Sequence, residues 1–282
     1  MSSHKSILLL LACIVLAGCN QAQTRVESAD AFVAGHGLIK IIIQTEQFKL
    51  FSYQSITSAE DVATFYIEGD GLAWLNRKRI SQNPTPENPV SLKLALTDPS
   101  ANVIYLARPC QYIDLKTEQH CSSDYWTTKR FAPEIIASID QAITQIKQRA
   151  NINKIRLVGY SGGGTIAAIL AATRNDVVDL RTVAANLDIE LFVRHHEVTP
   201  LTGSMNPIDF AKTLINIPQI HFVGEDDDIV TRAITESYIS DLKKYDVNLR
   251  CVKVQQIKNT SHAEGWETEW QRYVDEVVRC KK

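Results

Sequence analysis

The sequence lacks the features that mark several large classes of protein. Its 30 basic and 32 acidic residues give a formal net charge of −2, so it has no basic excess of the kind that binds nucleic acid or an anionic surface. None of its six cysteines belongs to a C-x-x-C pair, which excludes the short-spaced metal and redox motifs. Internal repeats and low-complexity segments are absent too. With 45% hydrophobic residues, the chain has the composition of an ordinary globular protein.

The long apolar run at the N-terminus has the features of a targeting segment. Lys5 supplies positive charge before residues 7–17, which are apolar but too few to span a bilayer as a helix. The sequence Leu16-Ala17-Gly18-Cys19 that follows resembles the lipobox of bacterial lipoproteins. This resemblance implies cleavage before Cys19, lipidation of that cysteine and attachment to the cell envelope. Asn20, in place of Asp, favours the outer membrane, with the protein facing the periplasm.

The rest of the chain is predicted to form one folded domain after a short linker. Residues 1–18 are assigned to the signal peptide. Residues 19–37 are polar and without periodicity, which predicts a lipidated Cys19 followed by a flexible tether. Residues 38–282 are then long enough to bury a single core.

Four cysteines remain besides the anchor, and an oxidising compartment would allow them to form disulfides. Four cysteines permit three pairings. We favour Cys110–Cys121 and Cys251–Cys280, because Cys251 begins a predicted strand and Cys280 ends the helix that packs back along it.

Strand-like and helix-like segments alternate along the chain, which favours a mostly parallel sheet covered on both faces. The first two strands read as an antiparallel hairpin at the sheet edge. The predicted strands cover residues 38–44, 47–53, 61–67, 102–107, 155–158, 180–187, 219–223 and 247–257. The predicted helices cover residues 90–96, 127–150, 162–173, 207–214, 229–244 and 266–279.

The most informative stretch is KIRLVGYSGGGTIAAILAAT, residues 154–173. A short β-branched run leads into Gly159-Tyr160-Ser161-Gly162-Gly163 and then into a helix-forming segment. This order of strand, G-x-S-x-G and helix is typical of a nucleophile elbow, in which a tight turn exposes a serine hydroxyl. No Lys-Ser/Thr follows and the spacing is not G-x-G-x-x-G, so the stretch is not a nucleotide-binding loop.

An antiparallel start, then strand–helix units with the elbow after the fifth strand, resembles the α/β-hydrolase superfamily. The resemblance covers nearly all of residues 38–282. It implies an α/β fold with a mostly parallel central sheet and helices on both faces. Residues 189–205, which follow the strand ending near Asp188, are expected to form a small cap or a long loop.

A serine hydroxyl needs a neighbouring base to become a nucleophile, and the superfamily order is Ser, then acid, then His. His262 follows the last predicted strand and precedes the last helix, so a loop at the carboxyl edge could return its imidazole to Ser161. The acid is expected after residues 219–223, where Gly224-x-x-Asp227-x-x-Val230 resembles the acid loop of the superfamily. Asp188, which also ends a predicted strand, is the rival acid.

Backbone donors for the oxyanion are expected at two places. One is the N–H of Gly162, directly after the nucleophile. The other is the N–H of Asp70, in the loop after the third strand. Glu68 departs from the His-Gly that is common at this point in the superfamily. Arg108 ends a strand nearby and could pair with a substrate carboxylate, or it could hold Asp70 or Glu68.

Aromatic side chains in the same loops are candidates for the substrate pocket, although packing explains them equally well. These side chains are Trp74, Tyr112, Trp126 and His196.

The sequence therefore predicts a lipid-anchored serine hydrolase that cleaves a small-molecule or lipid-like carboxylic ester without metal or cofactor. Two alternatives remain open. The same triad could cleave an amide or peptide bond, or the chain could be a non-catalytic envelope lipoprotein that binds a partner.

Overall fold

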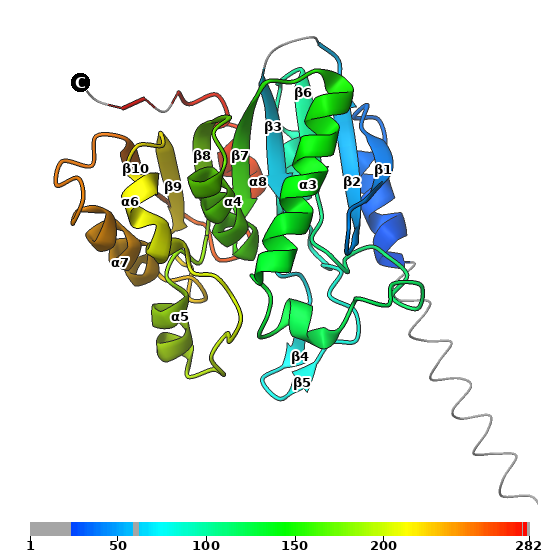
Figure 1. Ribbon diagram of the computed structural model, residues 1–282, viewed down its shortest axis with the longest axis horizontal. Helices are drawn as coiled ribbons and strands as arrows, with labels where there is room; N and C mark the ends of the chain where they lie inside the picture. The colour runs from blue at the N-terminus through cyan, green and yellow to red at the C-terminus, as the bar shows by residue number, and fades with distance from the viewer. Residues whose placement is uncertain (1–23, 59–61, 278, 281–282) are drawn as a thin grey trace, which may run out of the picture.

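The computed structural model describes residues 24–58, 62–277 and 279–280 (Figure 1). Its centre is an eight-stranded sheet in the order β1-β2-β6-β3-β7-β8-β9-β10. β1 pairs antiparallel with β2, and β2 with β6. The remaining neighbours pair in parallel. The predicted mostly parallel sheet with an antiparallel hairpin at its edge is thus confirmed.

The strands of this sheet are β1 (Ile39–Gln44), β2 (Lys49–Ile56), β3 (Val62–Ile67), β6 (Asn102–Leu106), β7 (Lys154–Tyr160), β8 (Val177–Val183), β9 (Gln219–Gly224) and β10 (Val252–Ile257). A separate two-stranded hairpin, which the sequence did not predict, consists of β4 (Trp74–Asn76) and β5 (Arg79–Ile80).

Helices cover both faces of the sheet, and each face has its own hydrophobic cluster. Figure 1 shows α3, α4, α6 and α7 on the near face, whereas α8 lies behind the sheet. The helices are α2 (Val90–Leu96), η1 (Ser123–Trp126), α3 (Pro133–Ala150), α4 (Gly162–Thr173), α5 (Ile189–His196), η2 (Pro207–Phe210), α6 (Ala211–Leu214), α7 (Arg232–Leu242) and α8 (Trp266–Trp270). In the part of the chain that the structure describes, no helix is long and apolar enough to cross a membrane.

The predicted flexible tether is wrong for residues 24–37. Residues 24–33 are helical, and Ala29 and Val33 are buried in the cluster behind the sheet. Asp30 accepts a hydrogen bond from the Tyr53 hydroxyl at 2.6 Å. Few apolar residues suffice here because they are spaced along one helix face. The folded body therefore includes residue 24, and the signal peptide and Cys19 lie outside the described residues.

Several predicted elements are shorter in the structure, among them β10, which begins at Val252 rather than at residue 247, and α7, which covers Arg232–Leu242 rather than residues 229–244. α3 begins at Pro133 rather than at residue 127, because the residue before a proline disfavours helical geometry. β8 ends at Val183, since Ala184 adopts a left-handed conformation (φ 48°). α8 ends at Trp270, and in the segment that follows it the buried Arg181 donates to the carbonyls of Tyr273 and Glu276.

Both predicted disulfides are present, Cys110–Cys121 and Cys251–Cys280. The first closes the loop between β6 and α3, which borders the carboxyl edge of the sheet. The second ties the C-terminal segment to the start of β10. Two disulfides restrict the unfolded chain and thereby favour the folded state.

The turn between β7 and α4 depends on two glycines that allow backbones to approach closely. A Cβ atom on Gly163 would collide with the carbonyl oxygen of Ile67, at the end of β3. A Cβ atom on Gly159 would collide with the carbonyl oxygen of Gly163. The start of α4 is therefore packed directly against the ends of β3 and β7.

We expect Gly163→Ala to lower the free energy of unfolding by about 3 kcal/mol, because the new methyl group meets backbone that has no room to move. Gly203→Ala is the control: its nearest neighbour is the flexible Lys129 side chain at 3.5 Å. In this control only the positive φ of residue 203 should matter, and we expect it to lower the free energy of unfolding by about 1 kcal/mol. Urea unfolding measures both, and equal costs would contradict the steric argument.

Candidate active site

Three side chains from three separate loops meet at the carboxyl edge of the sheet. Ser161 follows β7, Asp227 follows β9 and His262 follows β10. Nε2 of His262 lies 3.1 Å from the Ser161 hydroxyl oxygen. Nδ1 of the same ring lies 3.0 Å from Oδ2 of Asp227. The structure thus brings together the three residues that the sequence selected, in one hydrogen-bonded row.

Ser161 has the strained backbone of a nucleophile elbow, with φ 50° and ψ −121°. Its N–H donates to the carbonyl of Val183 at 2.9 Å, and its carbonyl accepts from Gly164 at 3.0 Å. These bonds hold a conformation that costs an L-residue about 1–3 kcal/mol. The side chain projects from the turn toward the imidazole instead of following the sheet or the helix.

Asp227, and not the rival Asp188, contacts the histidine. The side chain of Asp227 is 0% exposed, and its Oδ1 accepts hydrogen bonds from the N–H groups of Ile229 and Val230 at 3.0 and 2.8 Å. Asp188 is used elsewhere. It caps α5 by accepting from the N–H of Leu191, and its second oxygen accepts from the Ser237 hydroxyl.

A tyrosine and a tryptophan that sequence reasoning missed fix the histidine loop. The Tyr160 hydroxyl donates to the carbonyl oxygen of His262 at 3.0 Å, and the Trp266 indole N–H lies 3.1 Å from the same oxygen. The rings of Tyr160 and His262 are 5.5 Å apart between centroids. Tyr160 stands inside the G-x-S-x-G motif, so its position next to the nucleophile was the available signal.

The loop after β3 packs against the elbow at the position predicted for the second oxyanion donor. A Cβ atom on Gly69 would lie 3.3 Å from Cβ of Ser161. The carboxylate of Asp70 lies over Gly162, where a Cβ atom would collide with Oδ1. A negative charge therefore stands beside the amide that was predicted to hold an oxyanion.

Two arginines compensate this negative charge. Arg108 donates to Oδ1 of Asp70, and Arg130 donates to Oδ2 at 2.6 Å. Burial raises the pKa of Asp70, but the charges of Arg130 and Arg108 outweigh burial and hold the pKa below its usual value. Of the two roles left open for Arg108, the structure shows the one that holds Asp70.

Glu68 is buried directly behind this loop. Its Oε1 accepts hydrogen bonds from the N–H groups of Gly69 and Ser91, at 2.9 and 3.4 Å. Burial raises the pKa of Glu68 from 4.5 to about 7, although these hydrogen bonds oppose the shift. The residue that departs from the superfamily pattern is thus an internal support of the loop.

The four pocket candidates have different surroundings. Trp126 and Tyr112 belong to the two hydrophobic clusters, and Trp126 donates its indole N–H to the carbonyl of Ser81. Both side chains thus pack in the core, and a pocket role for them stays a prediction. Trp74 is exposed on β4, and His196 is half-buried at the end of α5, where Nε2 contacts the carbonyl of Ile229. The cap segment thus contains one helix followed by a loop.

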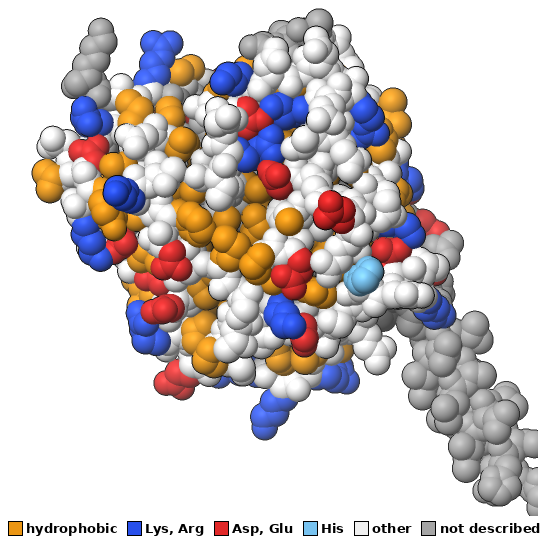
Figure 2. Space-filling model, in the orientation of Figure 1, with side chains coloured by type: hydrophobic (Ala, Val, Ile, Leu, Met, Phe, Trp, Pro, Cys, Tyr) orange, Lys and Arg blue, Asp and Glu red, His pale blue; other side chains and the backbone are white. Residues whose placement is uncertain are grey.

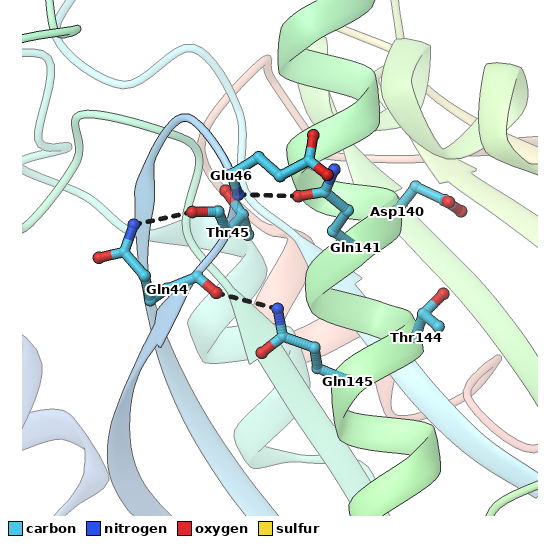
Figure 3. Close-up of a pocket in the computed structure, with 7 residues that line it drawn as sticks. All are labelled: Gln44, Thr45, Glu46, Asp140, Gln141, Thr144 and Gln145. Carbon is cyan, nitrogen blue, oxygen red and sulfur yellow. Dashed lines mark hydrogen bonds between the residues drawn. The ribbon is translucent and has the colours of Figure 1, made fainter.

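A polar groove of about 510 Å³ lies away from these residues, between the β1–β2 turn and α3 (Figure 3). Two hydrogen bonds cross it, from the N–H of Glu46 to Gln141 and from Gln145 to the carbonyl of Gln44. These contacts hold the edge of the sheet against α3. Ser161, Asp227 and His262 do not line the groove.

The fold is that of solved α/β-hydrolase esterases. An esterase of Pyrococcus furiosus is 12% identical, with a TM-score of 0.58, over 84% of this chain and 90% of its own. The esterase Est1E of Butyrivibrio proteoclasticus is 14% identical, with a TM-score of 0.58, over 83% of this chain and 95% of its own. A lidless serine hydrolase of Xanthomonas campestris is 11% identical, with a TM-score of 0.54, over 87% and 97%. No curated protein matches the sequence.

The sheet, the elbow and these neighbours define the protein as an α/β-hydrolase of the serine hydrolase class. More narrowly, the chain belongs to the family described as serine hydrolase (FSH1), whose model matches residues 87–248, more than half of its length. The match includes Ser161 and Asp227. His262 and the loop of Asp70 lie outside it.

The buried carboxyl of Glu68 makes stability depend on pH. Its pKa in the folded state, about 7, is above the ordinary glutamate value of 4.5, so the folded protein holds the proton more tightly. The stabilisation is complete below pH 4.5 and is lost as the pH rises to 7, by about 3 kcal/mol. We expect Glu68→Gln to remove this decline.

Urea unfolding of both proteins at pH 5 and pH 8 measures the difference. The wild-type protein should lose more unfolding free energy than Glu68→Gln over this interval. Parallel declines in the two proteins would show that Glu68 does not hold its proton in this way.

Proposed function

We propose that this protein is a serine hydrolase that cleaves carboxylic esters through an acyl-enzyme, with Ser161 as nucleophile, His262 as general base and Asp227 as the acid that orients it. The observation that carries the proposal is the continuous row of hydrogen bonds through Ser161, His262 and Asp227. A serine hydroxyl is almost never ionised at neutral pH. An imidazole within hydrogen-bonding distance can accept its proton as it attacks, which makes the oxygen nucleophilic.

In the acylation step the Ser161 oxygen attacks the ester carbonyl carbon while its proton moves to Nε2 of His262. Asp227 accepts the Nδ1–H bond and stabilises the imidazolium. When the tetrahedral intermediate collapses, the carbon–oxygen bond to the alcohol breaks and His262 gives its proton to the departing oxygen. The products of this half-reaction are the free alcohol and an ester on Ser161.

In the deacylation step water replaces the alcohol. His262 takes a proton from the attacking water, and the intermediate collapses by breaking the bond to Ser161. The serine oxygen regains its proton from His262, and the carboxylic acid leaves. Both protons pass through one imidazole, so no metal or cofactor is required.

The N–H groups of Gly162 and Asp70 are proposed to hold the oxyanion in both steps. The support is the packing of the loop of Asp70 against the elbow, together with two guanidinium groups on the Asp70 carboxylate. Two positive charges against one negative charge leave this side of the site net positive. A developing negative charge on the substrate oxygen is therefore tolerated despite the neighbouring carboxylate.

The same row of residues could cleave an amide or peptide bond, because the steps differ only in the leaving group. A comparison of kcat/KM for a nitrophenyl ester and the corresponding nitroanilide distinguishes the two activities. We favour the ester because an alkoxide leaves more readily than an amide nitrogen.

The location proposed for this activity is the bacterial cell envelope, with the protein anchored through a lipid on Cys19. The support is the lipobox-like Leu16-Ala17-Gly18-Cys19 and the pair of disulfides, which are typical of exported proteins. Mass spectrometry of the membrane-extracted protein tests this directly. A mature N-terminus at Cys19 carrying fatty acyl chains is expected.

A fluorophosphonate should label the full-length protein on Ser161, as shown by peptide mapping. Ser161→Ala should remove the label and lower ester turnover on the order of 10⁶-fold, with little change in unfolding free energy. His262→Ala should leave the hydroxyl present but unreactive.

The absence of an adduct on folded, disulfide-bonded protein would instead support the non-catalytic lipoprotein. Labelling that persists in Ser161→Ala would place the nucleophile elsewhere.

The identity of the acid can be tested with a matched pair of substitutions. Asp227→Asn should lower kcat about 10⁴-fold, because the amide favours the wrong imidazole tautomer. Asp188→Asn should leave kcat within about twofold, since its amide oxygen can still cap α5. A larger loss from Asp188→Asn than from Asp227→Asn would reverse the assignment.

A further inference from the structure

The β4–β5 hairpin combines exposed apolar and basic side chains within seven residues. Trp74, Leu75 and Ile80 are 37%, 45% and 38% exposed. Three consecutive cations, Arg77, Lys78 and Arg79, form its tip and are also exposed. The formal net charge of −2 for the whole chain concealed this local basic group.

The hairpin holds these side chains in a fixed arrangement. Trp74 and Ile80 are cross-strand partners, so they stand side by side on the same face. The side chain of Asn76 accepts hydrogen bonds from the N–H groups of Lys78 and Arg79, at 2.9 and 3.0 Å, which shapes the turn. At its base, the Ser81 N–H donates to the carbonyl of Ala73, and the buried Trp126 donates to the carbonyl of Ser81.

This chemistry suits the interfacial layer of an anionic bilayer. Tryptophan is enriched at membrane interfaces, where its apolar ring and polar N–H are both satisfied. Lysine and arginine next to an anionic lipid surface each contribute about a fivefold gain in binding. The other three tryptophans of the chain, Trp126, Trp266 and Trp270, are only 6%, 2% and 1% exposed.

The hairpin projects from the catalytic edge of the sheet. It follows directly on Glu68-Gly69-Asp70, the loop beside Ser161. Figure 1 shows the hairpin and α5 as the two projections of this edge. Figure 2, in the same orientation, shows basic, acidic and hydrophobic side chains along it. Two further exposed apolar residues, Val198 after α5 and Ile229 after Asp227, belong to the same edge.

The described chain also begins at this edge. The Arg25 guanidinium donates to the carbonyl of Thr85 and to the carboxylate of Glu87, both at 2.9 Å. These residues belong to the loop that continues from β5. Cys19 precedes Thr24 by five residues, which span at most about 17 Å whatever their conformation. A lipid on Cys19 would therefore hold this edge, and not the opposite one, close to the bilayer.

We propose that the β4–β5 hairpin inserts Trp74, Leu75 and Ile80 into the interface of an anionic bilayer, with Arg77, Lys78 and Arg79 on the lipid phosphates. The catalytic edge then faces the membrane, and the substrate class that follows is an amphiphilic ester presented from the bilayer. The substrate class rests on the proposed hydrolase function. The insertion of the hairpin rests only on its own residues and position.

Tryptophan fluorescence of the full-length protein, reconstituted in vesicles whose acyl chains carry bromine, tests the insertion. One set of vesicles contains phosphatidylethanolamine and phosphatidylglycerol, and the other only phosphatidylcholine. The lipid proposed on Cys19 would attach the protein to both, so that quenching reports the hairpin and not attachment. We expect quenching in the anionic vesicles that disappears in Trp74→Phe, since the other tryptophans are buried.

The variant Arg77→Gln/Lys78→Gln/Arg79→Gln should weaken insertion about 100-fold, at about fivefold for each cation removed, and reduce quenching to the level in phosphatidylcholine. The control Arg149→Gln/Lys154→Gln/Lys243→Gln removes three exposed cations from the opposite edge and should keep the quenching. Both variants should hydrolyse a water-soluble short ester at the wild-type rate. The hairpin variant alone should lose turnover of an ester embedded in anionic vesicles.

The proposal is overturned if anionic vesicles cause no quenching, if quenching survives Trp74→Phe, or if the control variant loses as much as the hairpin variant. A hairpin that binds a protein instead would give the first of these results. Failure of the hydrolase function is a separate outcome: the wild-type protein would then quench in anionic vesicles but hydrolyse neither ester.

Discussion

The close approach of three backbone segments at the elbow is the constraint on which the rest of the site depends. Because Gly163 has no side chain, the first turn of α4 lies directly against the carbonyl oxygen of Ile67. The loop that leaves β3 is therefore forced over Ser161 and Gly162. The positions of Gly69 and Asp70, and through them of the predicted oxyanion donors, follow from this contact.

The same crowding explains the unusual charges around the nucleophile. A carboxylate at Asp70 next to Gly162 would oppose an oxyanion, and removing it from water has a cost of its own. Arg108 and Arg130 make the arrangement tolerable by pairing with both of its oxygens. Behind the loop, Glu68 accepts the Gly69 N–H, so the loop is supported from the interior as well as from the surface. Local charge balance, and not the net charge of the chain, determines what this site can stabilise.

One edge of the sheet carries the reactive residues, the hairpin and the start of the described chain. This coincidence follows from parallel strands, whose carboxyl ends lie together and whose loops are free to carry function. Under our proposals the lipid anchor, the basic hairpin and Ser161 all lie on the edge of the protein that faces the bilayer. The site would then meet its substrate at the membrane surface and not in bulk solution.

Features that depend on a local pattern of residues could be predicted before the structure was known. The alternation of strands and helices and the elbow around Ser161 are visible along the chain, because each follows from residue spacing or turn chemistry. The order of nucleophile, acid and histidine was predicted from the resemblance to the α/β-hydrolase superfamily. Both disulfide pairings were also predicted, although the helix expected to return Cys280 to Cys251 ends at Trp270.

Features that depend on neighbours distant in sequence became visible only in the folded chain. Asp227 and Asp188 both follow strands, and only packing shows that one contacts His262 while the other caps α5. Residues 24–33 were predicted to be a polar tether because the segment has few apolar residues. Those few are buried only when the helix packs against the sheet. The segment after the last helix is held by the buried Arg181, about ninety residues earlier in the chain, which donates to the carbonyls of Tyr273 and Glu276. Contacts of this kind are made by folding, and no local pattern in the sequence encodes them.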